Sequence, residues 1–324
     1  MDNDALRDGD AEELVAFKAE NPPEEFDALL DYACAEIDSG RVAEGMGTLY
    51  LGLYGHPRSM SARDWEDQTR RARTGHALAS RVYQSPFTRR AYEKPRGYAG
   101  DAQLIDLIYE WQGTQGLTAL GEDIHMWERR SPGCRGVRAR RDLLAQALSY
   151  LPTTTKNPRV MSIACGHLRE ALGAHGVKDG AIAEFVALDQ DEESLKVVTG
   201  YGIPSIRAEH QSVKDVLMKR NRYRDFDFVY AAGLFDYLPD NVGRALTTAM
   251  FRMLRPGGRC WIANFAPDMV DIGYMDAFMD WRLIYRDEAQ LVSLTEGINP
   301  SELFSRRVFR EPNDCIVFCE LVRG

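Results

Sequence analysis

The first half of the chain carries its apolar residues at helical spacing, and no segment before residue 150 alternates as a strand would. Helices are expected at the following ranges: two within residues 10–40, split by Asn21-Pro22-Pro23, and one each at 61–92, 102–109 and 134–150. The pattern therefore predicts a helical N-terminal region over residues 1–150.

The pattern changes after a polar, proline-bounded segment at residues 151–158, where short apolar runs alternate with helical stretches. Strands are expected at 159–164, 184–188, 203–208, 226–231, 259–265, 305–310 and 314–322, and helices at 168–176, 191–200, 212–220, 241–255 and 286–296. Such alternation predicts an α/β domain with a mainly parallel sheet. The last two runs are joined by a short turn and predict an antiparallel hairpin, so residues 151–324 form the second expected domain.

Charge is distributed unevenly along the chain. The net charge is -9, but residues 1–40 hold 13 acidic and two basic residues, so the remainder is slightly basic. The overall acidity argues against a general nucleic-acid-binding protein. Residues 129–141 carry six arginines and no acid. This run has three interpretations: a solvated helix face, a clamp for an anionic substrate, or a contact with RNA.

Several classes of protein find no support in the sequence. The apolar runs are too short to span a membrane, and the acidic N-terminus is not followed by a signal-like apolar segment, which favours the cytoplasm. The six cysteines and six histidines are scattered, without the spacing of a metal site. We therefore expect buried, reduced thiols and no metal.

The loops after the expected strands carry candidate ligand-binding residues, because open α/β sheets bind ligands beyond the carboxyl ends of their strands. Gly166 follows the first strand, where the absence of a side chain lets the backbone approach a ligand. Asp189 ends the second strand and offers a carboxylate to the two hydroxyls of a ribose. The loop at residues 209–213 follows the third strand and is where an adenine would be met.

The order of these features resembles class I S-adenosylmethionine-dependent methyltransferases over residues 159–324. The resemblance lies in the glycine loop, the acid after strand two, the stretch FDFVYAAGLFDYLPD at residues 226–240, and LRPGG at 254–258. Two features depart from the common pattern: the loop has one glycine instead of three, and Tyr237 replaces a frequent histidine. A dinucleotide-dependent dehydrogenase would need a three-glycine turn for its phosphates, whereas Glu170 stands near that position here.

The resemblance implies a Rossmann-like methyltransferase sheet with S-adenosylmethionine as cofactor. The cofactor-binding residues that it implies are Ala164, Cys165, Gly166, Asp189, Gln190, Gln211, Ser212, Ala232 and Gly233.

A second, narrower resemblance covers parts of both regions. Residues 94–112, 124–127, 137–141 and 279–287 resemble a bacterial methyltransferase group named for the biosynthesis of 3-hydroxypalmitic acid methyl ester, a quorum-sensing signal. It implies a small anionic acceptor, a carboxylate converted to a methyl ester, with the N-terminal region as a lid or substrate-binding part. The alternatives are N- or O-methylation of a natural product, methylation of RNA or protein, and a non-catalytic partner protein that keeps the fold.

Candidate residues for catalysis and substrate binding lie in both regions. The catalytic candidates are Asp236, Tyr237, Tyr98 and His125. The substrate-binding candidates are Tyr98, Asp101, Arg138, Arg141, Asn264, Phe265, Trp281 and Tyr285. Some of them have a structural alternative: Asp101 is placed to cap the helix that begins at Ala102, and Trp281 and Tyr285, four residues apart, would share a helix face in a core or in a pocket.

Overall fold

The computed structural model describes residues 22–56, 60–109, 116–218 and 223–324, which form two compact units. The first unit consists of the described residues up to Arg135 together with Met269–Arg282. The second consists of Gly136–Asp268 and Leu283–Gly324. The division expected at residue 150 falls inside one helix, α10 (Pro132–Thr154), which also takes up half of the expected linker.

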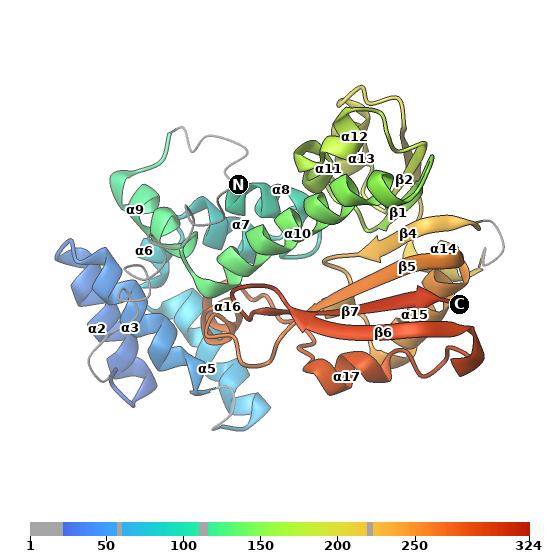
Figure 1. Ribbon diagram of the computed structural model, residues 1–324. Helices are drawn as coiled ribbons and strands as arrows, with labels where there is room; N and C mark the ends of the chain where they lie inside the picture. Colours follow the sequence, from blue (N-terminus) through green and yellow to red (C-terminus); the bar gives the residue numbers. More distant parts are fainter. Residues whose placement is uncertain (1–21, 57–59, 110–115, 219–222) are drawn as a thin grey trace. The chain divides into compact units, whose positions relative to one another are not determined.

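The second unit contains a seven-stranded sheet in the order β3-β2-β1-β4-β5-β7-β6 (Figure 1). The strands are β1 (Arg159–Ile163), β2 (Glu184–Asp189), β3 (Ile206–His210), β4 (Phe226–Ala231), β5 (Leu254–Phe265), β6 (Leu303–Arg310) and β7 (Ile316–Arg323). The first five run parallel, and β7 is antiparallel to both β5 and β6. The predicted Rossmann-like methyltransferase sheet with its antiparallel hairpin is confirmed.

The burial of the strands follows from their position in the sheet. Every residue of β4 is buried, because helices cover both faces of a central parallel strand, whereas the edge strands β3 and β6 are largely half-buried or exposed. The helices of this unit, besides α10, are α11 (Arg169–Gly173), α12 (His175–Lys178), α13 (Glu192–Thr199), α14 (Val213–Met218), α15 (Asp240–Arg252) and α17 (Glu288–Ser293). A short 3-10 helix follows β4 at Phe235–Tyr237, and another precedes β6 at Pro300–Glu302.

The first unit is helical throughout its described residues, as predicted. Its helices are α2 (Phe26–Asp38), α3 (Val42–Tyr54), α5 (Ala62–Gly75), α6 (Ala79–Val82), α7 (Pro86–Glu93), α8 (Ala102–Ile108), α9 (Ala119–Glu128) and α16 (Ile272–Phe278). The prediction of a single long helix at 61–92 is wrong, because three helices cover this range. The chain becomes extended at His76, and a new helix begins with Pro86 at its first position, where the missing N–H costs nothing. The acidic residues 1–21 lie outside the described residues.

Helix α16 follows β5 in the chain but packs within the helical unit. The Tyr274 ring stacks on Tyr50 at 4.4 Å between ring centroids, and the Tyr274 hydroxyl donates to the buried carboxyl of Glu128 at 3.1 Å. Glu128 also accepts hydrogen bonds from the hydroxyls of Ser85 and Thr88. A buried polar group costs free energy unless it is hydrogen-bonded, so this cluster specifies how α16 packs.

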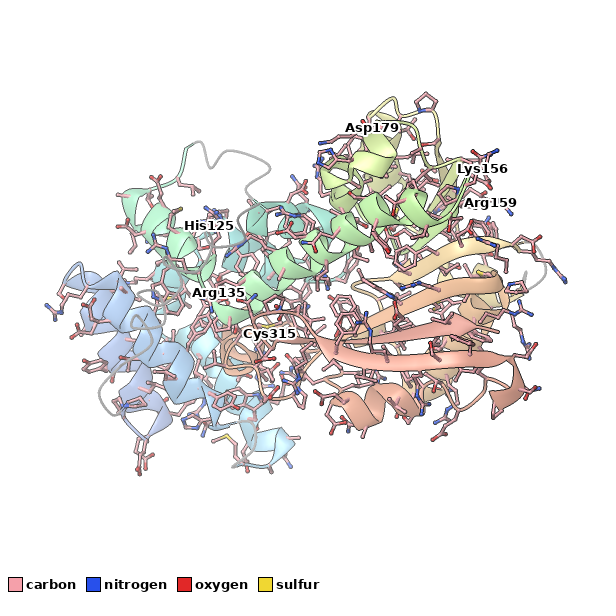
Figure 2. All side chains as sticks on the ribbon, in the orientation of Figure 1. His125, Arg135, Lys156, Arg159, Asp179 and Cys315 are labelled. Atoms are coloured by element: carbon pink, nitrogen blue, oxygen red, sulfur yellow. The ribbon has the colours of Figure 1, made fainter. Side chains whose placement is uncertain are left out.

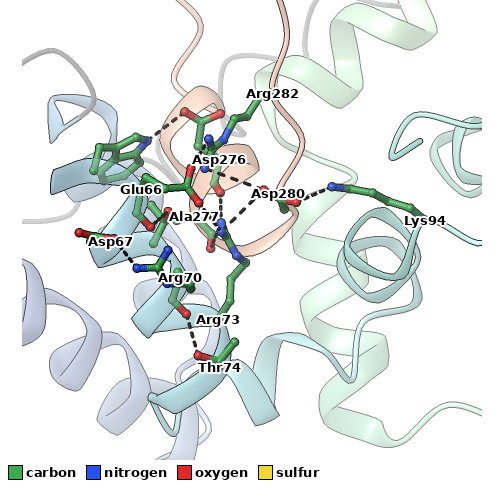
Figure 3. Close-up of polar contacts among 12 residues, drawn as sticks. Glu66, Asp67, Arg70, Arg73, Thr74, Lys94, Asp276, Ala277, Asp280 and Arg282 are labelled. Atoms are coloured by element: carbon green, nitrogen blue, oxygen red, sulfur yellow. Dashed lines mark hydrogen bonds and ion pairs between the residues drawn. The ribbon is translucent and has the colours of Figure 1, made fainter. Parts of the chain in front are cut away.

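Polar and charged side chains of the helical unit also bind residues 276–280, which lie at the end of α16 and just after it (Figure 3). The Trp65 indole N–H donates to Asp276 at 3.1 Å, and Arg73 donates to the Asp276 carbonyl oxygen at 2.7 Å. Lys94 forms an ion pair with Asp280. All six cysteines are buried free thiols, as predicted, and none of the described helices has the length and apolarity needed to cross a bilayer.

The Glu128 carboxyl makes the stability of the protein depend on pH. Burial raises its pKa from 4.5 to about 7, although three hydroxyl donors lower it. A folded-state pKa above the unfolded value means that stability is fully present below about pH 4.5 and is lost as pH rises through 7. In the wild type, we expect this carboxyl to lower the free energy of unfolding by roughly 3 kcal/mol between pH 5 and 8. The Glu128→Gln variant should lack this decrease, as measured by urea unfolding at each pH. Glu122→Gln, at an exposed position of the same helix, should leave the pH profile unchanged.

Candidate active site

The loop after β1 adopts an unusual backbone conformation. Ala164, Gly166 and Leu168 all have positive φ, at 54°, 54° and 48°. Left-handed backbone costs an L-residue about 1–2 kcal/mol, and glycine relieves that cost. The sequence shows a single glycine, but three alternate residues take the conformation that favours glycine. The loop therefore holds two residues with side chains, Ala164 and Leu168, in the left-handed conformation that glycine adopts most easily.

Asp189 at the end of β2 holds this loop. Its Oδ2 accepts the Gly166 N–H at 2.7 Å, and its Oδ1 accepts the Asp191 N–H at 2.8 Å. Burial raises the pKa of the carboxyl, and the backbone N–H donors lower it. Each carboxylate oxygen has a second lone pair, so two bonds to backbone amides leave capacity for two hydroxyls. The predicted ribose carboxylate thus also has a structural role.

The other predicted cofactor residues lie at neighbouring strand ends of the same unit. The Gln211 N–H donates to the Asp189 carbonyl oxygen at 2.9 Å, which fixes the loop after β3 against the loop after β2. Ser212 accepts the Asp215 N–H at 3.2 Å and donates to its carboxylate at 2.6 Å, so it begins α14. Gln190 is exposed, and burial raises the pKa of the Cys165 thiol, which keeps it protonated at neutral pH.

A buried arginine organises the loop after β4. The Arg286 guanidinium is 2% exposed and donates to the carbonyl oxygens of Phe235 at 2.8 Å and Leu238 at 2.7 Å. It also donates to the Asn264 side-chain oxygen at 2.8 Å and to Asp240 at 2.6 Å. These bonds join the 3-10 helix after β4 to the end of β5. Arg286 was missed by the sequence analysis, because an arginine in an irregular segment carries no periodic signal.

Asp236 lies inside this loop. Its Oδ1 accepts the Phe265 N–H at 2.7 Å, and its carbonyl oxygen accepts the Ile284 N–H at 2.8 Å. Burial raises the pKa of the Asp236 carboxyl to about 6, while the Phe265 N–H and the charges of Arg140 and Arg286 lower it. Of the predicted catalytic residues, Asp236 is thus a buried carboxyl that changes its charge close to neutral pH, and its neighbour Tyr237 is half-buried.

Among the arginines at residues 129–141, Arg140 contacts the loop after β4, although the sequence analysis selected Arg138 and Arg141 instead. Arg140 is buried, and its Nη1 donates to the Ala232 carbonyl oxygen at 2.8 Å. Arg141 pairs with its neighbour Asp142 at 2.7 Å, and Arg138 is half-buried. The missed signal was helical spacing: Arg140 shares the buried face of α10 with Val137 and other apolar residues, at a position where a solvated arginine would not stand.

Four predicted residues belong to the helical unit: Tyr98, Asp101, His125 and Trp281. The capping prediction for Asp101 is confirmed: its Oδ1 accepts the Leu104 N–H at 2.8 Å. Arg90 donates to both of its oxygens, at 2.9 and 2.7 Å, which gives Asp101 a structural role. His125, on α9 (Figure 2), is buried, and burial lowers its pKa to about 4, so its ring is neutral at pH 7. Tyr98 is half-buried.

The shared helix face predicted for Trp281 and Tyr285 is wrong. Helix α16 ends at Phe278, Asp280 has a φ of 46°, and residues 281–287 form no helix. Trp281 is buried in the helical unit with its ring 6.5 Å from that of Phe87, whereas Tyr285 belongs to the second unit. At its end the segment contacts the end of β5, where the Arg286 N–H donates to the Phe265 carbonyl oxygen at 3.0 Å.

Several solved structures are similar to this chain. A possible exported protein from Bordetella parapertussis is 18% identical, with 83% of this chain and 98% of that chain covered and a TM-score of 0.61. Magnesium protoporphyrin IX methyltransferase from Synechocystis is 13% identical over 72% and 97% of the two chains, with a TM-score of 0.46. The N-methyltransferase NodS from Bradyrhizobium japonicum, with bound S-adenosyl-L-homocysteine, is 14% identical over 58% and 87%, with a TM-score of 0.42. No family model and no curated protein sequence matches the chain.

The left-handed loop after β1 makes a testable contribution to stability. We expect Ala164→Gly to raise the free energy of unfolding by about 1 kcal/mol, because glycine adopts φ 54° without the clash of a Cβ atom. Ala183 is exposed and is not among the positive-φ residues, so Ala183→Gly should lower stability by about 0.5 kcal/mol. Urea unfolding measures both variants. A loss of stability in Ala164→Gly would mean that this alanine is not strained.

Proposed function

We propose that the protein is an S-adenosylmethionine-dependent methyltransferase that acts on a small molecule. The observation that carries the proposal is the left-handed loop at Ala164–Leu168, tied through the Gly166 N–H to Asp189. The strand order reverses between β1 and β4, so this loop stands where open α/β sheets bind ligands. A backbone open to close approach beside a carboxylate fits the ribose of a nucleoside.

The charges near the loop favour a nucleoside without phosphate. Glu170 lies in the first turn of α11, directly after the loop, and accepts a hydrogen bond from the Tyr230 hydroxyl at 2.7 Å. A dinucleotide would place its pyrophosphate near such a position, where an acid opposes it. S-adenosylmethionine carries no phosphate, so the residues present fit it better than they fit a dinucleotide.

Methyl transfer demands alignment more than chemical assistance from the protein. S-adenosylmethionine supplies a methyl group on a positively charged sulfur, and the transfer is an in-line displacement at that carbon. Within the loop after β4, the Asp236 side chain is 2% exposed, so it is shielded from bulk water, as methyl transfer favours. The hydrogen bonds from Phe265 and Arg286 hold this loop rigidly, which favours one orientation of an acceptor.

Two acceptor classes compete within this proposal. A carboxylate that gives a methyl ester follows from the resemblance at residues 94–112 and from Arg138 and Arg141 as its clamp. A hydroxyl or amine that must lose a proton is favoured by Asp236, whose pKa of about 6 suits a general base near neutral pH. Because Arg141 already pairs with Asp142, the position of Asp236 gives the stronger argument.

Calorimetry with S-adenosylhomocysteine and with NADH tests the cofactor. We expect S-adenosylhomocysteine to bind with one-to-one stoichiometry and NADH not to bind. Asp189→Ala should weaken the binding at least tenfold, because it removes a charged acceptor. Asp189 also holds Gly166, so the substitution could disturb the loop. The circular dichroism of the Asp189→Ala variant is therefore compared with that of the wild type. Asp179→Ala, at an exposed site of the same unit, is the control. NADH binding without S-adenosylhomocysteine binding would refute the proposal.

The pH dependence of methyl transfer distinguishes the acceptors. A labelled methyl group is followed into products of a cell extract, and the rate with the identified acceptor is then measured from pH 5 to 8. With Asp236 as the base, kcat/KM rises with pH through a midpoint near 6, because only the deprotonated carboxylate accepts a proton. Asp236→Asn keeps an acceptor for the Phe265 N–H but should abolish the rise and lower kcat at least a hundredfold. A flat profile and an alkali-labile product would instead identify a carboxylate acceptor.

A further inference from the structure

We propose that Arg140 binds the α-carboxylate of the methionine moiety of the cofactor. This inference rests on the proposed function and assigns a second anchoring point to the same site. Three observations carry it: the burial of Arg140, the small use of its hydrogen-bond donors, and its place at the reversal of strand order.

The guanidinium of Arg140 is buried but sparsely bonded. The residue is 6% exposed, and its hydrogen bond to the Ala232 carbonyl oxygen uses one of its five N–H donors. Among the residues that the structure describes, no acidic group pairs with Arg140 within ion-pair distance. Buried charges in proteins are paired or bind a ligand, because an unpaired one is costly. Arg286, which is 2% exposed, contrasts with Arg140, because its donors are used on four partners of the protein itself.

The two acids that feel the charge of Arg140 form no ion pair with it. Burial raises the pKa values of the Glu170 and Asp236 carboxyls, and the charge of Arg140 lowers both, so the guanidinium lies within electrostatic range of both acids. Glu170 is already bonded to the Tyr230 hydroxyl, and Asp236 to the Phe265 N–H. A carboxylate brought by a ligand would form the paired hydrogen bonds that a guanidinium prefers.

The order of the strands matches the order of groups along the cofactor. The loop after β3 is the candidate for adenine, and Asp189 after β2 is the candidate for ribose. Neighbouring strands lie about 5 Å apart, so the next groups of an extended ligand reach the ends of β1 and β4. Arg140 stands there, beside Ala232. A Cβ atom at Gly233 would lie 3.4 Å from its Nη1, so the loop passes the guanidinium without an intervening side chain.

Two ligands that differ in the amino-acid part test the assignment. S-adenosylhomocysteine carries the carboxylate, whereas 5′-methylthioadenosine has the same nucleoside and sulfur without it. We expect Arg140→Met to weaken S-adenosylhomocysteine binding tenfold to a hundredfold and to change methylthioadenosine binding less than twofold, measured by calorimetry. Arg140→Lys should recover part of the loss, because lysine keeps the charge but lacks the planar fork. Arg252→Met, at an exposed position in the last turn of α15, is the control.

Each outcome has a separate meaning. An equal loss of affinity for both ligands would show that Arg140 positions the loop at Ala232, and would overturn the proposal. Unchanged affinity for both ligands, with a raised KM for the acceptor, would assign Arg140 to the acceptor and overturn it too. Binding of methylthioadenosine by Arg140→Met also reports that the variant is folded. Failure of the wild type to bind either ligand would refute the proposed function itself.

Discussion

The hydrogen bonds of the buried Arg286 guanidinium determine how the candidate site of the second unit is arranged. The guanidinium bonds to carbonyl oxygens of the loop after β4 and to Asn264 at the end of β5, so two neighbouring parallel strands end in a fixed relation. Its ion pair with Asp240 reaches a side chain that is largely exposed, so solvent screens that contact and the buried bonds carry most of the constraint. An aliphatic side chain could fill the same volume but would leave several carbonyl groups without a donor.

This constraint explains why Asp236 is both buried and ionisable. Burial alone opposes a charged carboxylate, but the Phe265 N–H and the positive charges of Arg140 and Arg286 favour it. The opposing effects leave its pKa between the value of a solvated carboxyl and that of one buried without donors. The two arginines therefore serve different purposes: Arg286 is saturated by protein groups and fixes the loop, whereas Arg140 keeps donors for a ligand.

Periodicity and turn residues predicted the sheet well, because buried parallel strands such as β4 are nearly continuous apolar runs bounded by polar residues. They also located Asp189 and Asp236, which end or follow strands. Sequence patterns failed where contacts between distant segments determine the backbone conformation. The left-handed Ala164 looks ordinary in a sequence, and Trp281 and Tyr285 had helical spacing without forming a helix. Arg140 could have been found, since it occupies an apolar face of α10, whereas the donors that hold Asp236 come from distant positions that no local pattern connects.

The place of α16 within the helical unit bears on how the chain folds during synthesis. Residues 269–282 complete that unit, so the helices made first remain without part of their core until the ribosome has added well over a hundred further residues. At typical elongation rates this delay is on the order of ten seconds, which is long compared with helix packing. During that interval the surface of Tyr50 that later stacks on Tyr274 has no covering ring. The nascent chain thus exposes an aromatic surface of the helical unit until residues 269–282 have been made.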